Sequence, residues 1–290
     1  MQQLMESIIQ SAVDRGATFA DLRLTDGNAT SIVVEDGRAN KVSSNRTRGA
    51  GLRVLVDGAW GFAPTNQPDE RELSRCVADA IEMARAAASH VTDPGMVATV
   101  DPVYGETGKA PRIAPGQVPL DDRLKSVIEL EQAARSQHSS QIANTVASYT
   151  DGSGEMFLAN SLGTFLHYSS TGTSIGVLVV ATDGSIRQRV SERKSNRCGF
   201  ELVEELDLES MGKAAADKAV DLLSAERPPA GAFDVIIDPR ICGLLVHEAF
   251  GHNSEADAVW SGNSILDGKL GELVAAEQVT IVDDPTIPGH

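Results

Sequence analysis

The feature of the sequence that most limits its fold is a repeated order of local patterns: one amphipathic helix, several β-prone runs and a second helix. In the first segment, residues 1–15 and 69–90 carry apolar side chains at helical spacing. Asp26-Gly27-Asn28 and Asp36-Gly37 are hairpin turn signals between the β-prone runs. Strands joined by such turns form an antiparallel sheet, and the helices need an apolar sheet face to cover. The expected strands are residues 21–23, 31–35, 41–43 and 51–56.

The second segment follows the same order without a convincing residue-level repeat. A helix begins near Asp121 or Asp122, and another covers residues 206–225. Asp151-Gly152 and Asp183-Gly184 separate β-prone runs between these helices. We therefore expect an α+β fold, with antiparallel sheets packed with helices in two N-terminal units. The expected strands are residues 142–149, 155–160, 164–170, 175–182 and 185–191.

Proline-rich stretches mark the expected domain boundaries. Five of the 12 prolines lie between residues 94 and 119, where apolar periodicity is weak. Pro228-Pro229-Ala230-Gly231 forms a second break. The expected parts are an N-terminal α+β unit at 1–95, a proline-rich linker or loop at 96–120, a second α+β unit at 121–227, and the start of a metal-bearing C-terminal domain at 232–290.

Composition excludes several classes of protein. The chain has 25 basic and 41 acidic side chains, a formal net charge of −16, which opposes direct binding of nucleic acid because such binding needs a basic surface. No apolar run is long enough to span a membrane. Three widely spaced cysteines do not form a disulfide framework. We therefore expect a cytoplasmic protein.

The segment with the clearest chemistry is His247-Glu248-Ala249-Phe250-Gly251-His252. Two imidazoles with an adjacent glutamate are typical of a zinc site with its general base. On a regular α-helix, five residues rotate a side chain by about 500°, which leaves the two imidazoles about 140° apart. A π-helical turn, with its i to i+5 repeat, brings them nearly into line. We expect this distortion, or a helix end, at Gly251.

The residues before the motif predict a rigid mounting for it. Residues 233–238 have the composition of a buried strand, and Pro239 fits the first position of a helix that leads into the histidines. A strand, a tight turn and a helix would hold the ligands firmly.

Several sequence blocks besides the histidine motif carry a resemblance to a known family. They are Ala20-Asp-Leu-Arg, Gly49-Ala-Gly-Leu-Arg-Val, Trp60-Gly-Phe-Ala, Asp234-Val-Ile-Ile-Asp-Pro, His247 to Asp257 and Val279-Thr-Ile-Val-Asp-Asp. With these blocks the chain resembles the TldD/PmbA family, historically labelled modulators of DNA gyrase, over nearly its whole length.

The resemblance implies a zinc metallopeptidase that hydrolyses unfolded peptides. It implies that His247 and His252 are zinc ligands and that Glu248 is the general base acting on zinc-bound water. It also implies that a TldD-type subunit, which carries the motif, pairs with a related PmbA/TldE-type subunit that lacks it. A homo-oligomer is the alternative assembly.

The chain departs from the family pattern in two places. The family's third zinc ligand is a cysteine far downstream of the motif, whereas Cys76, Cys198 and Cys242 all precede it. We therefore expect a C-terminally truncated sequence whose third ligand lies beyond its end. The second departure is the run after His252, which keeps only Glu255 and Asp257 of the family's pattern, and these carboxylates are candidates for orienting the imidazoles.

Two other functions compete with the peptidase. A non-catalytic binding or assembly subunit would have an incomplete metal site, because the third ligand is missing. A serine hydrolase would use Ser174 in Gly172-Thr173-Ser174-Ile175-Gly176, but the residues that follow predict a strand where that motif needs a helix. A basic cluster consists of Arg187, Arg189, Arg193, Lys194 and Arg197, with Arg187 and Arg189 expected on one strand face. It is interpreted either as a solvated strand face or as a surface that binds a peptide carboxylate or the acidic surface of a partner.

Overall fold

The chain divides into two units. The computed structural model describes residues 1–284, 286 and 287. One unit is Met1–Ala225, and the other begins at Glu226. Each unit is described separately below.

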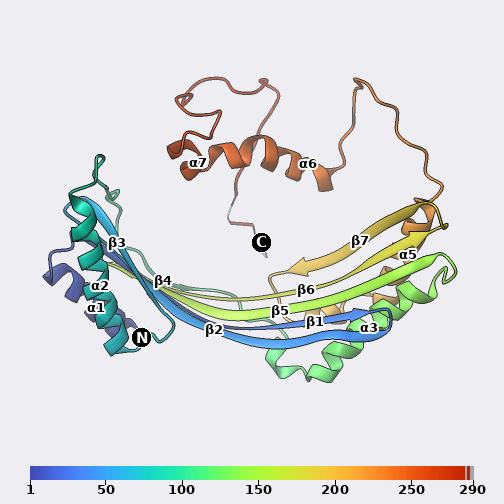
Figure 1. Ribbon diagram of the computed structural model, residues 1–290, viewed down its shortest axis with the longest axis horizontal. Helices are drawn as coiled ribbons and strands as arrows, with labels where there is room; N and C mark the ends of the chain where they lie inside the picture. Colours follow the sequence, from blue (N-terminus) through green and yellow to red (C-terminus); the bar gives the residue numbers. More distant parts are fainter. Residues whose placement is uncertain (285, 288–290) are drawn as a thin grey trace. The chain divides into compact units, whose positions relative to one another are not determined.

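The first unit is built on one seven-stranded sheet (Figure 1). Its strand order is β3-β2-β1-β5-β6-β4, and β7 also pairs with β6. All pairings are antiparallel except that of β4 with β6. The strands are β1 (Phe19–Glu35), β2 (Arg38–Val56), β3 (Ala59–Thr65), β4 (Tyr104–Thr107), β5 (Ile142–Asn160), β6 (Phe165–Thr182) and β7 (Arg187–Asn196).

Two of the predicted turns are wrong, because the short predicted strands join into long ones. Gly27 lies inside β1, where it pairs with Thr47 of β2 and with Gly154 of β5. A Cβ on Gly27 would lie 3.2 Å from the carbonyl oxygen of Ser153, so this glycine permits close strand approach rather than a turn. Asp151-Gly152 likewise lies within β5. The local turn signal is overridden because strands on both sides pair with the backbone.

The Asp36-Gly37 turn between β1 and β2 is confirmed. Asp36 and Gly37 have φ values of 45° and 78°, as a two-residue hairpin turn requires. The Asp36 carboxylate also accepts a hydrogen bond from the backbone N–H of Thr145 at 2.9 Å. This bond lowers the pKa of Asp36 and ties the turn to β5.

All four long helices of this unit pack on one face of the sheet. Alternate residues of a strand point to the same face of the sheet. In β1, Leu22 and Leu24 belong to the core under α1 and α2, and Ile32 and Val34 belong to the core under α3 and α5. All four positions are even-numbered, so both cores lie on the same face. The opposite face carries no helix of this unit (Figure 1). The helices are α1 (Gln2–Asp14), α2 (Glu70–Ala88), α3 (Leu120–Ser136) and α5 (Leu208–Asp221), with a short α4 (Glu201–Glu204) before α5.

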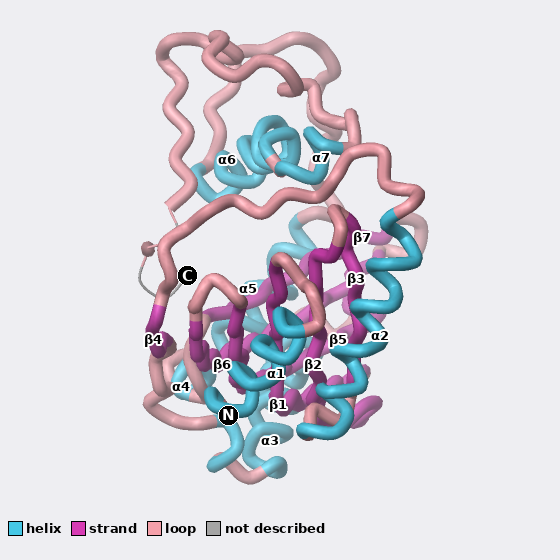
Figure 2. Tube along the Cα trace, turned by 90° about the vertical axis from the view of Figure 1, so that its left-hand side faces the viewer, coloured by secondary structure: helices cyan, strands magenta, loops and turns pink. Residues whose placement is uncertain are grey.

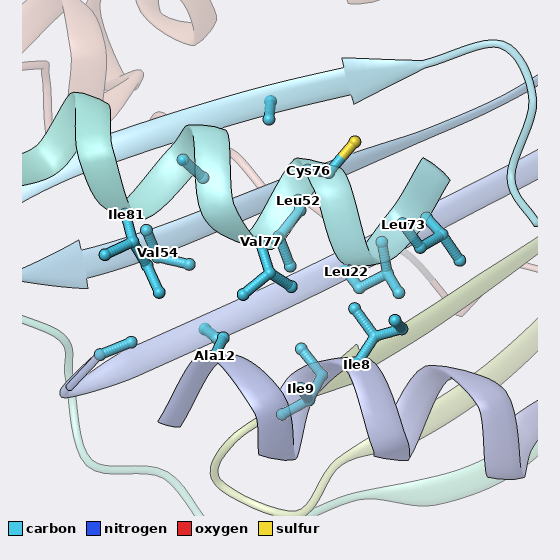
Figure 3. Close-up of a cluster of buried hydrophobic side chains, with 14 of the residues drawn as sticks. Ile8, Ile9, Ala12, Leu22, Leu52, Val54, Leu73, Cys76, Val77 and Ile81 are labelled. Carbon is cyan, nitrogen blue, oxygen red and sulfur yellow. The ribbon is translucent and has the colours of Figure 1, made fainter. Parts of the chain in front are cut away.

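Two separate apolar cores form under these helices. In the first, Ile8, Ile9 and Ala12 of α1 point toward the sheet beside Val77 and Ile81 of α2 (Figure 3). Helix α2 lies along β3 (Figure 2). A Cβ on Gly61 of β3 would come within 1.9 Å of the Ala80 carbonyl oxygen of α2. The second core lies under α3 and α5.

The predicted α+β class, with antiparallel sheet packed with helices, is therefore confirmed. The sheet itself is shared, since β1 of the first expected unit pairs with β5 of the second from Asp21 to Glu35. The division at residues 95 and 121 stays a prediction. The intervening residues 96–120 include β4 and a 3-10 turn, η1 (Pro115–Gln117), and the Glu201 side chain accepts hydrogen bonds from the N–H groups of Arg112 and Ile113.

The second unit contains short helices joined to long loops (Figure 2). They are α6 (Pro239–Val246), a π-helical turn η2 (His247–Gly251), a 3-10 turn η3 (His252–Ser254) and α7 (Ala256–Trp260). The predicted strand at 233–238 is wrong, since these residues are not part of a β-sheet among the described residues and Ile236 is fully exposed. A strand requires a neighbour for its backbone groups, and none of the described residues supplies one. Ser264 is the one buried residue among those described in this unit.

Among the described residues, no helix combines the length and apolar character needed to cross a membrane.

Candidate metal centre

The histidine motif begins directly after an α-helix, occupies a π-helical turn and ends at the first residue of a 3-10 turn. Helix α6 begins at Pro239, and the Asp238 carbonyl accepts hydrogen bonds from the N–H groups of Ile241 and Cys242. The α-helical pattern ends at Val246 and is followed by the π-helical turn His247–Gly251. The π-type distortion predicted from the five-residue spacing is therefore confirmed.

The π-helical turn places both imidazoles next to each other. The ring centroids of His247 and His252 are 4.3 Å apart, with an angle of 63° between the ring planes. Glu248 lies beside them, with its Oε2 3.9 Å from Nε2 of His252. One ligand atom from each of these three residues lies within 4.8 Å of the others. A single ion could contact all three.

Glu255 holds the second imidazole from its other side. Its Oε1 lies 2.8 Å from Nδ1 of His252. When the carboxylate is ionised, Nδ1 carries the proton and donates it, so that Nε2 presents its lone pair on the side of Glu248. A carboxylate on the remote nitrogen is the usual way in which a metal-binding imidazole is oriented.

Asp257, the other candidate carboxylate, is engaged elsewhere. Its Oδ1 accepts a hydrogen bond of 3.0 Å from the backbone N–H of Ala258, within α7. The structure thus brings together His247, Glu248, His252 and Glu255, and shows no bond from Asp257 to either imidazole. The roles of all five residues stay predictions.

Hydrogen bonds between Asn253, which follows His252, and a later loop were not predicted from the sequence. Asn253 accepts two hydrogen bonds from a later loop: its carbonyl oxygen from the Ser264 hydroxyl, and its side-chain oxygen from the N–H of Ile265 at 3.3 Å. The available signal is weak, because Asn and Ser side chains bond to backbone groups in many loops.

The donor set fits zinc. Two imidazole nitrogens and one carboxylate oxygen are donors that zinc prefers. Gly251 leaves the first imidazole accessible, since a Cβ there would lie 3.3 Å from Nδ1 of His247. Over the described part of the chain, this is the one group of three or more His, Cys, Asp or Glu side chains that meets the geometric requirement for a metal ion. The three side chains are exposed in this unit.

The Ser174 alternative does not have the geometry of a hydrolase elbow. Ser174 lies inside β6, which continues to Thr182, and its hydroxyl accepts a hydrogen bond from Arg193 at 3.3 Å. The prediction that a strand follows this serine is confirmed.

Comparison with known proteins places the whole chain in one family. Three consecutive domain models match: domain 1 of the PmbA/TldA metallopeptidases at residues 20–84, their central domain at 113–223, and their C-terminal domain at 230–290.

Individual relatives agree with these matches. A metalloprotease of Methanothermobacter thermautotrophicus is 36% identical over 98% of this chain and 60% of its own length. A zinc metalloprotease TldD homologue of Saccharolobus solfataricus is 24% identical over 97% of this chain and 61% of its own length. The chain therefore spans about three-fifths of the relatives that it matches.

A solved structure supports the fold. TldE from Thermococcus kodakarensis superposes with a TM-score of 0.70 at 15% identity, over 92% of this chain and 58% of that one. Together with the three domain matches, these likenesses show that the chain belongs to the PmbA/TldD metallopeptidase family.

Proposed function

We propose that this chain is the motif-bearing part of a zinc-dependent peptidase. The observation that carries the proposal is the meeting of His247, Glu248 and His252 within 4.8 Å on a π-helical turn. The family membership and the name of the Saccharolobus relative support zinc as the metal.

His247 and His252 would hold the ion. A zinc ion held there would supply Lewis-acid polarisation of the scissile carbonyl and of the attacking water. Glu248 is exposed, and the ion pair that it makes among the described residues is a long one of 3.9 Å with His252, so its carboxylate would be able to take a proton from the attacking water. Glu248 then passes this proton to the leaving amine nitrogen. Glu255 keeps the His252 ring in position during both transfers.

The third zinc ligand is proposed to come from outside residues 1–290. Two imidazoles leave a catalytic zinc one protein ligand short, since catalytic sites use three and keep one position open. Glu248 would otherwise have to serve both as ligand and as base.

Substrates, partner and compartment belong to the same proposal. We propose unfolded peptides as substrates, and a PmbA/TldE-type subunit or a second copy of the protein as the partner. The cytoplasm is the proposed compartment, which agrees with Cys76, Cys198 and Cys242 being free thiols.

The test combines metal content with turnover. Zinc per chain would be measured by elemental analysis for this chain, for a version extended as in its relatives, and for each with His247→Ala. Cleavage of a quenched fluorescent unfolded peptide would then be compared for the extended protein and its Glu248→Gln variant.

We expect about one zinc per extended chain, lost in His247→Ala, and a Glu248→Gln variant that retains zinc but loses turnover. Absence of zinc from every version would refute the peptidase and favour a non-catalytic binding or assembly subunit. Full activity of Glu248→Gln would refute the role of this residue as the base.

A further inference from the structure

Strand β7 is an edge of the sheet with an open side. It pairs with β6 from Arg187 to Asn196. Over the described residues, no other strand pairs with it, and no loop backbone bonds to it. The N–H and C=O groups on its outer side are therefore free to pair with another extended chain.

Three arginines project from β7 onto the helix-free face of the sheet. Arg187, Arg189 and Arg193 pair in register with Thr182, Val180 and Gly176 of β6. These partners alternate with the β6 residues that pack under α3 and α5, so all three arginines point away from the helices. They are exposed, and the facing positions on β6 carry no acidic side chain.

These arginines also lack acidic partners in the described part of the chain. Arg193 donates to the Ser174 hydroxyl, and no ion pair involves any of the three. On the opposite face of the same strand, Glu192 pairs with Lys218 of α5. A row of unpaired cations is unusual in a chain whose net charge is −16, because acidic groups are abundant.

We infer that β7 is a docking edge for an extended acidic peptide. The peptide adds as a further strand, so that its backbone pairs with the outer side of β7 and its carboxylates meet the arginines on the helix-free face. Alternate residues of a strand share one face and repeat every 6.6 Å or so. The preferred ligand therefore carries acidic side chains at alternate positions.

A peptide suits this edge better than a nucleic acid. The free N–H and C=O groups of a strand edge match those of a peptide backbone. A nucleic acid has no such backbone groups and would contact the arginines alone. Charged residues on an edge strand can also serve only to prevent edge-to-edge aggregation. Arginines with that role would show no preference for the spacing of acidic residues in a ligand. Peptides of different spacing therefore distinguish a docking edge from protection against aggregation.

The test measures peptide affinity by fluorescence anisotropy with the full chain. The probes are two labelled 12-residue peptides of equal composition, (Glu-Thr)6 and (Glu-Glu-Thr-Thr)3, and a labelled thymidine 12-mer. The variant Arg187→Gln/Arg189→Gln is compared with Lys194→Gln/Arg197→Gln. The control pair loses the same charge from nearby positions, and Lys194 lies in register with Ile175 on the helix-covered side.

We expect (Glu-Thr)6 to bind at least fivefold more tightly than (Glu-Glu-Thr-Thr)3 and more tightly than the thymidine 12-mer. The Arg187/Arg189 variant should lose at least tenfold in affinity, while the control variant loses less than threefold and both keep the circular dichroism spectrum of the parent. Two further versions of (Glu-Thr)6 carry N-methyl groups on all Glu amides or on all Thr amides. Only alternate N–H groups of an added strand face β7, so one of the two versions should lose binding and the other should keep it.

Equal affinity for the two peptides, equal loss in the two variants, or no peptide binding would overturn the inference. Tighter binding of the thymidine 12-mer would show a general polyanion surface instead. Because no metal takes part, a failure here leaves the zinc proposal intact, and peptide binding in the presence of EDTA would support this inference alone.

Discussion

Replacement of Glu255 by glutamine tests whether this carboxylate orients the metal-binding imidazole. The variant keeps the size of the side chain but removes its charge, and glutamine has no preference for one tautomer of His252. The contact at stake is the 2.8 Å bond between Oε1 and Nδ1. We therefore expect weaker zinc binding, with the fold unchanged.

The expected magnitude follows from the exposure of the pair. Loss of a carboxylate behind a metal-binding histidine costs about 10- to 100-fold in affinity. The side chains of His252 and Glu255 are 53% and 50% exposed, so water screens the charge and competes for Nδ1. We expect the lower end of the range, about tenfold, which is about 1.4 kcal/mol.

Zinc affinity would be measured by competition with a chromophoric chelator near neutral pH. Asp257→Asn is the matched control, because it removes the same charge two residues away but its carboxylate bonds to the N–H of Ala258. We expect less than a twofold effect from Asp257→Asn. Equal effects of the two variants would reduce the role of Glu255 to its charge alone, and an unchanged affinity in Glu255→Gln would refute the orienting role.

Three further predictions concern the two units separately. Gly61→Ala should lower the free energy of unfolding, measured by urea titration, by at least about 3 kcal/mol, because its Cβ would lie 1.9 Å from the Ala80 carbonyl oxygen. The control Gly116→Ala should change this free energy by less than about 0.5 kcal/mol, because no atom lies within 4 Å of its Cβ. Burial opposes ionisation of Glu201, but hydrogen bonds from backbone N–H groups outweigh it and lower the pKa to about 2 from 4.5. The ionised Glu201 side chain therefore stabilises the fold fully above pH 4.5, its unfolded pKa, and this stabilisation is lost as the pH falls toward 2. Glu201→Gln should lower the free energy of unfolding by about 2 kcal/mol at neutral pH. Urea titrations at lower pH should show a smaller difference between the variant and the parent. Gly251→Ala should weaken zinc binding in the chelator assay, because its Cβ would lie 3.3 Å from Nδ1 of His247. The helix content should stay equal or rise, because the backbone of Gly251 is already helical. An unchanged zinc affinity would contradict the need for a glycine at this position.

The helices could be predicted from the sequence, but the continuity of the strands could not. The predicted helices at 69–90 and 206–225 correspond to α2 and α5, since apolar spacing along one helix is a local property. The local sequence Asp26-Gly27-Asn28 predicts a turn. Gly27 is nevertheless a strand residue, because Thr47 and Gly154, which are distant in the sequence, pair with it. The open edge of β7 could not be predicted for the same reason. Alternation along a strand placed Arg187 and Arg189 on one face, but the addition of Arg193 to that face and the unpaired side of the strand depend on the pairing of β7 with β6.

The candidate metal centre was more accessible to sequence analysis than the sheet, because its geometry arises within nine residues. The five-residue spacing of His247 and His252 conflicts with an α-helix and agrees with a π-helical turn, and that turn is present. The strand predicted just before it, at 233–238, is absent because its formation depends on partners that no described residue provides. The same reasoning separates the two halves of the proposed function. Glu255 and Glu248 act on an imidazole in their own turn and can be tested in this chain, whereas the third ligand and the substrate contacts depend on distant segments. Zinc affinity in this chain should therefore respond to the local variants even where peptide turnover requires the extended protein.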